Sequence, residues 1–239
     1  GIMYGYYGLD WAYLLVLLGV GLTLGAQAFL KSTFARYAKV QSSTGLTGRE
    51  VAEQILRANG IYDVTVQAIG GQLTDHYDPA KKTVNLSEVI YDSRSIAALG
   101  VAAHECGHAI QDDKSYFPLR FRHALVPLAN LGSQLAMPII IIGLMLSNGR
   151  NFLGPQLLNL GLLAFCLAVL FQLVTLPVEF NASHRALIQL RELHILPPKE
   201  EAQARSVLFA AALTYVAGAA SSLLQLLRLW ILFGGRRRK

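Results

Sequence analysis

Four long stretches with almost no charged residues restrict the fold of this chain more than any other feature. They lie at residues 11–30, 124–146, 152–176 and 207–233. Each is at least as long as the roughly 20 apolar residues that cross the hydrocarbon core of a bilayer. Lipid offers no hydrogen-bonding partner to the backbone, so segments of this kind must be helical. The sequence therefore predicts an integral membrane protein, mainly α, with about four transmembrane or membrane-embedded helices.

The fourth stretch leaves two arrangements open. Gln225 and Arg228 make its second half the least lipid-like part of the four stretches. If 207–233 crosses the bilayer, the basic tail at 234–239 lies outside the cytoplasm, against the usual preference of Lys and Arg for the cytoplasmic side. The stretch is therefore either a crossing whose direction the earlier spans impose, or a re-entrant or surface-lying segment.

The polar regions 31–123 and 177–206 face the same side of the bilayer, because the spans at 124–146 and 152–176 form a hairpin between them. The two regions hold 15 of the 21 Lys and Arg residues. Basic residues favour the cytoplasmic side of membrane proteins, so we expect both regions in the cytoplasm. The net charge of +6 follows largely from basic residues beside membrane ends and does not indicate nucleic-acid binding.

Region 31–123 has the pattern of a small α+β domain. A capping box at Thr47–Glu50 predicts the start of a helix, and Asn59 with Gly60 predicts its end. A second helix is expected from Ser93 or Ser95 to Ile110, and its first half is apolar all round, which is typical of a buried helix. Between the two helices the sequence predicts three extended pieces, at Val64–Ile69, Gln72–Tyr77 and Thr83–Leu86.

The second helix of this region carries the motif HExxH, at residues 104–108. Two histidines four residues apart lie on one side of a helix, one turn apart, so His104 and His108 can share one zinc ion. A glutamate directly after the first histidine can act as general base on a zinc-activated water, and Glu105 has this place. The motif predicts a zinc metallopeptidase with one catalytic Zn²⁺.

A catalytic zinc ion needs a third protein ligand and an open position for water. Glu179 is the favoured third ligand, because it follows the third span on the same side of the bilayer as the histidines. Pro177 can begin a helix or kink one there, and a carboxylate near a helix start is stabilised by the helix dipole. The alternative third ligands are His184, His123, His76, Asp75 and Asp78.

Several further residues are candidates for roles beside the metal. A donor is needed for the tetrahedral oxyanion of peptide hydrolysis, and Arg185, His184, His76 and Tyr77 are candidates. The strand at Thr83–Leu86 is a candidate for pairing with an extended substrate, as edge strands do. Cys106 fits better as a small packed residue than as a nucleophile.

The chain resembles the YugP-type membrane zinc metallopeptidases over nearly its full length. The resemblance rests on five runs of residues, at 43–48, 73–79, 101–111, 173–183 and 211–217. It implies a small zincin-like domain, a location in the bacterial cytoplasmic membrane and a multi-pass topology. It also implies that His104, His108 and Glu179 are the zinc ligands.

More distantly, the chain is similar to the HtpX-type proteases and the CAAX prenyl endopeptidases, which are gluzincins. Their third ligand lies in the pattern Glu-aromatic-x-Ala-Asp, and residues 179–183 match it except that Ser183 replaces the Asp. In those relatives the Asp orients a ligating histidine. The resemblance therefore leaves open whether Ser183, Asn181, Asp75 or Asp78 has this task here.

Together these features predict an integral-membrane zinc-dependent endopeptidase that hydrolyses peptide bonds of membrane or membrane-proximal proteins. The expected partners are a peptide or protein substrate and the lipid bilayer. The alternative is a non-catalytic membrane scaffold or binding protein with a structural zinc. A structural zinc site is closed by four ligands and needs no general base, so Glu105 favours the enzyme. A channel or transporter is less favoured, because Arg228 is the only charged residue in the four stretches.

Overall fold

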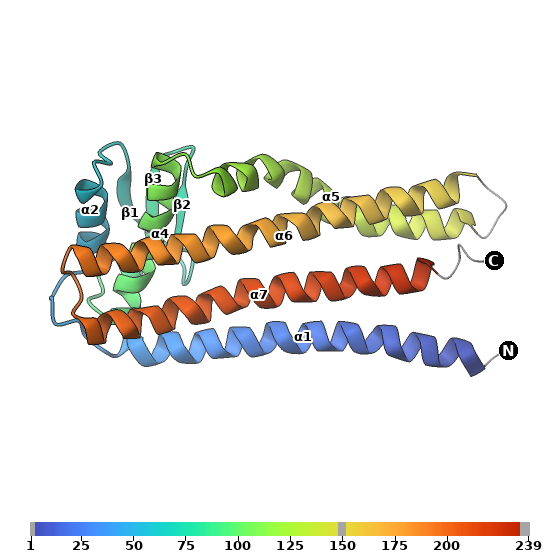
Figure 1. Ribbon diagram of the computed structural model, residues 1–239, viewed down its shortest axis with the longest axis horizontal. Helices are drawn as coiled ribbons and strands as arrows, with labels where there is room; N and C mark the ends of the chain where they lie inside the picture. Colours follow the sequence, from blue (N-terminus) through green and yellow to red (C-terminus); the bar gives the residue numbers. More distant parts are fainter. Residues whose placement is uncertain (1–2, 148–151, 235–239) are drawn as a thin grey trace. The chain divides into compact units, whose positions relative to one another are not determined.

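The computed structural model describes residues 3–147 and 152–234. Residues 148–151 of the predicted hairpin loop and residues 235–239 of the predicted basic tail lie outside this description. The described residues form seven helices and one three-stranded sheet (Figure 1). The predicted fold class, a mainly α membrane protein with a small α+β part, is confirmed.

Four helices are long and apolar enough to cross a membrane, judged by length and composition over the described residues. They are α1 (Met3–Ala38), α5 (Phe117–Ser147), α6 (Leu153–Glu192) and α7 (Pro198–Gly234). The fourth apolar stretch of the sequence lies within α7, which is one continuous helix.

Pro177 lies inside α6 and does not begin a helix, so the expectation that Glu179 sits at a helix start is wrong. A proline inside a helix removes one backbone hydrogen bond at a cost of about 3 kcal/mol or more. The turns after Pro177 remain helical because one of their faces is fully buried, at Val178, Ala182 and Ala186. Burial of this face outweighs the lost hydrogen bond, and the helix dipole is no reason for the position of Glu179.

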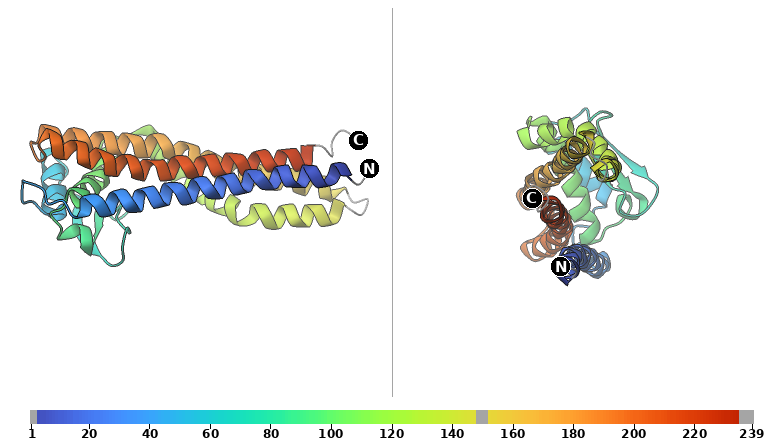
Figure 2. Two further views of the ribbon diagram at one scale, coloured as in Figure 1. Left: turned by 90° about the horizontal axis from the view of Figure 1, so that it is seen from below. Right: turned by 90° about the vertical axis from the view of Figure 1, so that its right-hand side faces the viewer.

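The chain divides into two compact units. The first comprises residues 1–25, 121–175 and 215–239. In this unit α1 and α7 run side by side in both views of Figure 2, with Gly19 against Ser221. A methyl group at Gly132 of α5 would lie 2.6 Å from the carbonyl oxygen of Ala164 in α6. Small residues thus let neighbouring helices approach closely, as is common between membrane helices.

The second unit comprises residues 26–120 and 176–214 and contains the sheet. Its strands are β1 (Thr65–Ile69), β2 (His76–Asp78) and β3 (Thr83–Ser87), in the order β1-β3-β2. Strand β3 pairs parallel with β1 and antiparallel with β2. Because both of its sides are occupied, the expectation that Thr83–Leu86 pairs with a substrate is wrong. The edge strands are β1 and β2.

The extended piece expected at Gln72–Tyr77 is only partly a strand, because β2 begins at His76. Leu73 has a left-handed backbone, with φ of 55°, and the Thr74 hydroxyl donates a hydrogen bond to the Gly70 carbonyl. The chain therefore turns where the sequence pattern indicated continued extension.

The core of the second unit surrounds helix α4 (Ile96–Asp113), which packs against α2 (Gly48–Ala58), α3 (Glu88–Tyr91) and the sheet. Helix α2 begins at the predicted cap, where the Thr47 hydroxyl accepts a hydrogen bond from the Glu50 amide. The first half of α4 is buried, as its apolar sequence predicts. Its largest fully buried side chains are Ile96 and Leu99.

Candidate metal centre

Helix α4 presents the two histidines from the middle of the core. Its start is fixed by Ser95, whose hydroxyl accepts a hydrogen bond from the Ala98 amide. His104 and His108 lie one turn apart on this helix, with their ring centroids 4.9 Å apart. Glu105 lies between them in sequence and is 8% exposed. The motif is therefore held rigidly and largely out of solvent.

Gly107 allows helix α6 to approach the histidine-bearing face of α4. A methyl group at this position would overlap the carbonyl oxygen of Ala182 in α6. At Gly100, about two turns earlier on α4, a methyl group would meet Ala204 at an ordinary 3.6 Å. The absence of a side chain at Gly107 therefore lets α4 and α6 come into contact beside the motif.

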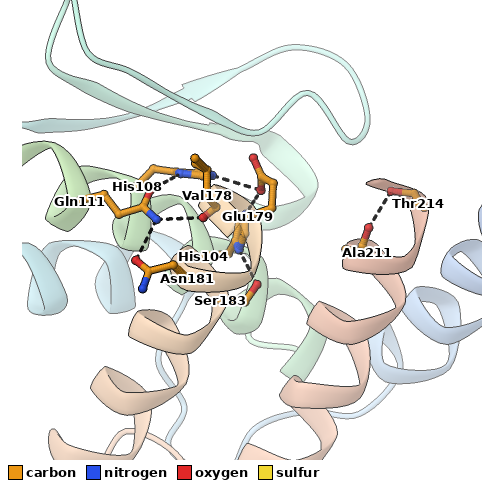
Figure 3. A network of polar contacts seen from close by, with 9 residues as sticks. All are labelled: His104, His108, Gln111, Val178, Glu179, Asn181, Ser183, Ala211 and Thr214. Atoms are coloured by element: carbon orange, nitrogen blue, oxygen red, sulfur yellow. Dashed lines mark hydrogen bonds and ion pairs between the residues drawn. The ribbon is translucent and has the colours of Figure 1, made fainter. Parts of the chain in front are cut away.

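This contact places Glu179 of α6 against both histidines. Glu179 Oε2 lies 2.9 Å from His104 Nε2 and 3.3 Å from His108 Nε2 (Figure 3). Among the described residues, the ligand atoms of these three side chains lie within 4.8 Å of one another and could hold a metal ion. Tetrahedral ligands bound 2.0–2.2 Å from a zinc ion are about 3.3–3.6 Å apart. The two separations between the carboxylate oxygen and the imidazole nitrogens, 2.9 and 3.3 Å, are near this range.

The other ring nitrogen of each histidine has an oxygen partner. His104 Nδ1 lies 2.9 Å from Ser183 Oγ, and His108 Nδ1 lies 2.9 Å from Gln111 Oε1. A neutral histidine that ligates through Nε2 carries its proton on Nδ1 and donates it to such a partner. Two imidazole nitrogens and one carboxylate oxygen, oriented in this way, are a donor set typical of zinc. The residues therefore fit the predicted ion.

Comparison with known proteins agrees with this geometry. Residues 12–234 match the model of a family described as "Putative neutral zinc metallopeptidase". The chain belongs to this family. A relative from Bacillus subtilis (strain 168), described as "Putative membrane protease YugP", is 47% identical over 219 residues, which cover 92% of this chain and 95% of the relative. No solved structure matches the chain.

Membership of this zinc metallopeptidase family confirms the resemblance inferred from the sequence. It also agrees with the zinc cofactor expected from the HExxH motif and with the metal-binding group of two histidines and a glutamate. Peptides or proteins are the substrates that a peptidase family implies, and the four apolar helices make the chain a membrane protein.

Ser183 is the residue at which the sequence departs from the more distant gluzincins. Its hydroxyl makes the contact with His104, so in this chain Ser183 is the partner of that histidine. Asp75 instead accepts hydrogen bonds from the amide and hydroxyl of Ser87. Asp78 accepts from the amides of the turn that follows it. These two aspartates therefore stabilise local backbone.

The other candidates lie apart from the metal-binding group as the described residues define it. The histidines and aspartates weighed as alternative third ligands do not join that group. His184 is exposed, and His76 Nδ1 and Nε2 face the Thr74 carbonyl and the Asn85 amide. The Arg185 Nε donates to Asn181, and the Tyr77 hydroxyl donates to Asp112.

Cys106 has the character of a packed residue. It is fully buried, and its sulfur faces the Ala52 carbonyl at 3.6 Å. Burial raises the pKa of its thiol above the ordinary value, so the reactive thiolate is disfavoured.

Sequence reasoning missed two residues that build the centre, Gly107 and Gln111. Both lie in or just after the motif, and Gln111 is three residues after His108, a spacing at which helical side chains meet. That spacing is a signal that could have identified Gln111. The partner of Gly107 is on another helix, 75 residues later at Ala182, and no local pattern indicates it.

Proposed function

We propose that the protein is an integral-membrane zinc-dependent endopeptidase that hydrolyses peptide bonds of membrane or membrane-proximal proteins. The observation that carries this proposal is the convergence of His104 Nε2, His108 Nε2 and Glu179 Oε2 beside Glu105. Three ligands leave one position of a tetrahedral site open, which is the arrangement of catalytic zinc sites. Family membership supports the same reading.

The three ligands would bind one Zn²⁺. A zinc ion in this position supplies a Lewis acid, which polarises the scissile carbonyl and makes a water molecule far more acidic. The chain holds the ligands ready for this ion, because Glu179 is 5% exposed and His108 is 6% exposed. Their positions therefore need little rearrangement on binding.

Glu105 is the proposed general base. It accepts a proton from the attacking water and then delivers that proton to the nitrogen of the leaving amine, which restores its carboxylate. It directly follows His104 on α4, the motif position from which a glutamate can reach a zinc-bound water. Its burial also limits competition from bulk water.

Of the four residues considered as oxyanion stabilisers, we propose His76 as the one with the best support. It lies on β2, an edge strand that packs against α4. A free strand edge can pair with an extended peptide, and His76 would then lie beside the bound backbone. Arg185 and His184 lie on α6 and not on a strand edge, so we rank both below His76.

We further propose that the active site faces the cytoplasm of a bacterial cell and that the chain crosses its cytoplasmic membrane several times. The concentration of Lys and Arg in residues 31–123 and 177–206 supports this orientation. The four apolar helices support a multi-pass topology. A substrate would then reach the site as a segment at or near the cytoplasmic membrane surface.

Substitution at the centre tests the enzyme against a scaffold with a structural zinc. We expect Glu105→Gln to retain Zn²⁺ and to lose cleavage at least about 100-fold, because a general base contributes a factor of this size. We expect Glu179→Ala to lose most of its Zn²⁺ binding and most of its peptide cleavage. Metal analysis of the purified chain and a chelator-reversible peptide cleavage assay measure these two properties.

Glu53→Gln is the matched control, because Glu53 is a partly exposed residue of α2 that pairs with Arg49. It should bind zinc and cleave peptide as the wild type does. Undiminished cleavage by Glu105→Gln would exclude Glu105 as the base. Zinc binding without any cleavage in the wild-type chain would favour the scaffold.

A further inference from the structure

Gln111 is the most completely buried polar side chain near the candidate centre. It lies on α4 and is 0% exposed. A buried carboxamide is costly unless both its oxygen and its nitrogen have hydrogen-bond partners. The partners of Gln111 belong to both helices that carry the proposed ligands.

The two ends of the Gln111 carboxamide contact different helices. Its Oε1 lies 2.9 Å from Nδ1 of His108 on α4. Its Nε2 donates to the carbonyl oxygen of Val178 at 2.8 Å and to Asn181 Oδ1 at 3.1 Å, both on α6 (Figure 3). Val178 directly precedes Glu179. One side chain therefore joins a proposed histidine ligand to the helical turn that carries the proposed carboxylate ligand.

The direction of this hydrogen-bond chain is fixed at its α6 end. A backbone carbonyl can only accept, so the atom of Gln111 that faces Val178 must be the donor Nε2. Arginine can only donate, and Arg185 Nε contacts Asn181 Oδ1 at 2.7 Å, so Asn181 also presents an acceptor to Gln111. Two acceptors on one side fix the orientation of the carboxamide.

The fixed orientation determines the tautomer of neutral His108. Because Gln111 Oε1 can only accept, Nδ1 of His108 must carry a proton, and in the neutral imidazole Nε2 then presents a lone pair. That Nε2 is the atom that faces Glu179 at 3.3 Å. The tautomer that a metal ligand requires is thus imposed by the carbonyl of Val178, through Gln111.

We propose that Gln111 is a positioning residue that couples the two ligand-bearing helices, fixing the tautomer of His108 and the place of the α6 turn that carries Glu179. This inference rests on the proposed zinc site. Gln111 does not touch the reacting atoms, and it acts through His108 and through the backbone before Glu179.

Zinc affinity of the full chain in detergent tests this role. Gln111→Met keeps the length of the side chain and removes both hydrogen-bonding ends. We expect a 10- to 100-fold weaker Zn²⁺ affinity, measured by competition with a fluorescent chelator, because partners of ligating histidines typically contribute this much. We also expect an altered absorption spectrum after substitution with Co²⁺, since a misoriented His108 changes the ligand geometry.

Gln189→Met is the matched control. Gln189 lies on α6 and accepts a hydrogen bond from Asn59 at the end of α2, so the same change removes an interhelical amide contact elsewhere in the same unit. Its Zn²⁺ affinity and Co²⁺ spectrum should equal those of the wild type. Thermal unfolding of the metal-free variants shows how much each change affects stability alone.

The outcomes separate this inference from the proposed function. A folded Gln111→Met with Zn²⁺ affinity within threefold of the wild type and an unchanged Co²⁺ spectrum overturns the inference alone. A wild-type chain that binds no Zn²⁺ overturns the proposed function and this inference with it. If Gln111→Met does not fold, the Zn²⁺ affinity of Gln111→Asn decides, because this variant keeps a carboxamide that is one methylene too short to contact His108 and Val178 together. A loss of Zn²⁺ affinity of threefold or more in this variant supports the coupling, and a smaller loss overturns it.

Discussion

The two histidines of the candidate centre are oriented by different means. His108 faces a carboxamide whose direction is fixed, whereas His104 faces the hydroxyl of Ser183, which can donate or accept. The side chain of His108 is 8% exposed and that of His104 is 16% exposed. The comparison shows that the fold fixes the orientation of the His108 ring before a metal ion binds, whereas the orientation of the His104 ring can adjust to the bound ion.

The largest effect is expected from Gly107→Ala, which separates α4 from α6 and so disturbs both histidines. In Gly107→Ala the added methyl group overlaps the Ala182 carbonyl, so α6 must move away from both histidines together with Glu179. We expect at least about a 100-fold loss of Zn²⁺ affinity, more than the loss of one partner of a ligating histidine. Competition with a chelator measures it.

Gly100→Ala provides the control for Gly107→Ala on the same helix. The added methyl group meets Ala204 at an ordinary distance, and alanine favours a helix over glycine by about 1 kcal/mol. Zinc affinity should be unchanged and thermal stability equal or higher. Equal zinc affinities for the two alanine variants would show that close approach at Gly107 does not build the centre.

Ser183→Ala gives a smaller effect and tests the comparison directly. His104 loses its hydroxyl partner, but its greater exposure lets a water molecule accept the Nδ1 proton instead. We expect a three- to tenfold loss of Zn²⁺ affinity, below the loss for Gln111→Met. A larger loss for Ser183→Ala than for Gln111→Met would reverse our ranking of the two histidines.

Ser183→Asp should sharpen the comparison in the other direction. A carboxylate accepts strongly from Nδ1 of His104 and makes the imidazole a better ligand. We expect Zn²⁺ affinity to rise a few-fold, measured with the same chelator as for Ser183→Ala. Weaker binding than in the wild type would mean that the added charge costs more than the stronger hydrogen bond contributes.

The smallest effect concerns the end of α4 beyond Gln111. Burial opposes ionisation of Asp112, but hydrogen bonds from Tyr77 and Lys82 outweigh it, so the net pKa of Asp112 is below its ordinary value. A carboxyl group whose pKa is lower in the folded state than in the unfolded state stabilises the fold at pH values above its unfolded-state pKa. This stabilisation is lost as the pH falls through the folded-state pKa. The loss should therefore occur below about pH 4.

Asp112→Asn tests this pH dependence on the metal-free chain. We expect the variant to be less stable by about 1 kcal/mol at pH 7 and to lose less stability than the wild type on acidification. Thermal unfolding between pH 7 and pH 3 measures both. Identical acid dependence in the two proteins would mean that Asp112 does not contribute, and zinc affinity at pH 7 should change little because Asp112 contacts no proposed ligand.

The sequence alone predicts much of this molecule wherever a pattern is local. The four apolar stretches, the cap at Thr47 and the buried helix with His104 and His108 all depend on spacing within one element. Two sequence arguments favour Glu179 as the third ligand. Its position after the third span is a sound argument, whereas the expected helix start at Pro177 is wrong. Burial of the residues after Pro177, which keeps the helix intact, depends on the tertiary fold.

Features that depend on contacts between distant segments escaped sequence reasoning. The order β1-β3-β2 reverses the expected role of Thr83–Leu86, because a parallel crossover places the last strand in the centre. The need for Gly107 follows only from the backbone of Ala182. The double contact of Gln111 requires knowing that Val178 lies opposite it. Each of these three features depends on contacts between residues far apart in the chain.

The burial of Cys106 gives the protein an intrinsic chemical reporter. Its sulfur is shielded between α4 and the Ala52 carbonyl of α2, so a maleimide can react with it only after these helices separate. With Cys166 replaced by serine, the labelling rate of this single thiol would measure how often the helix that carries the histidines becomes detached. Slower labelling in the presence of zinc would give the local stabilisation that metal binding provides.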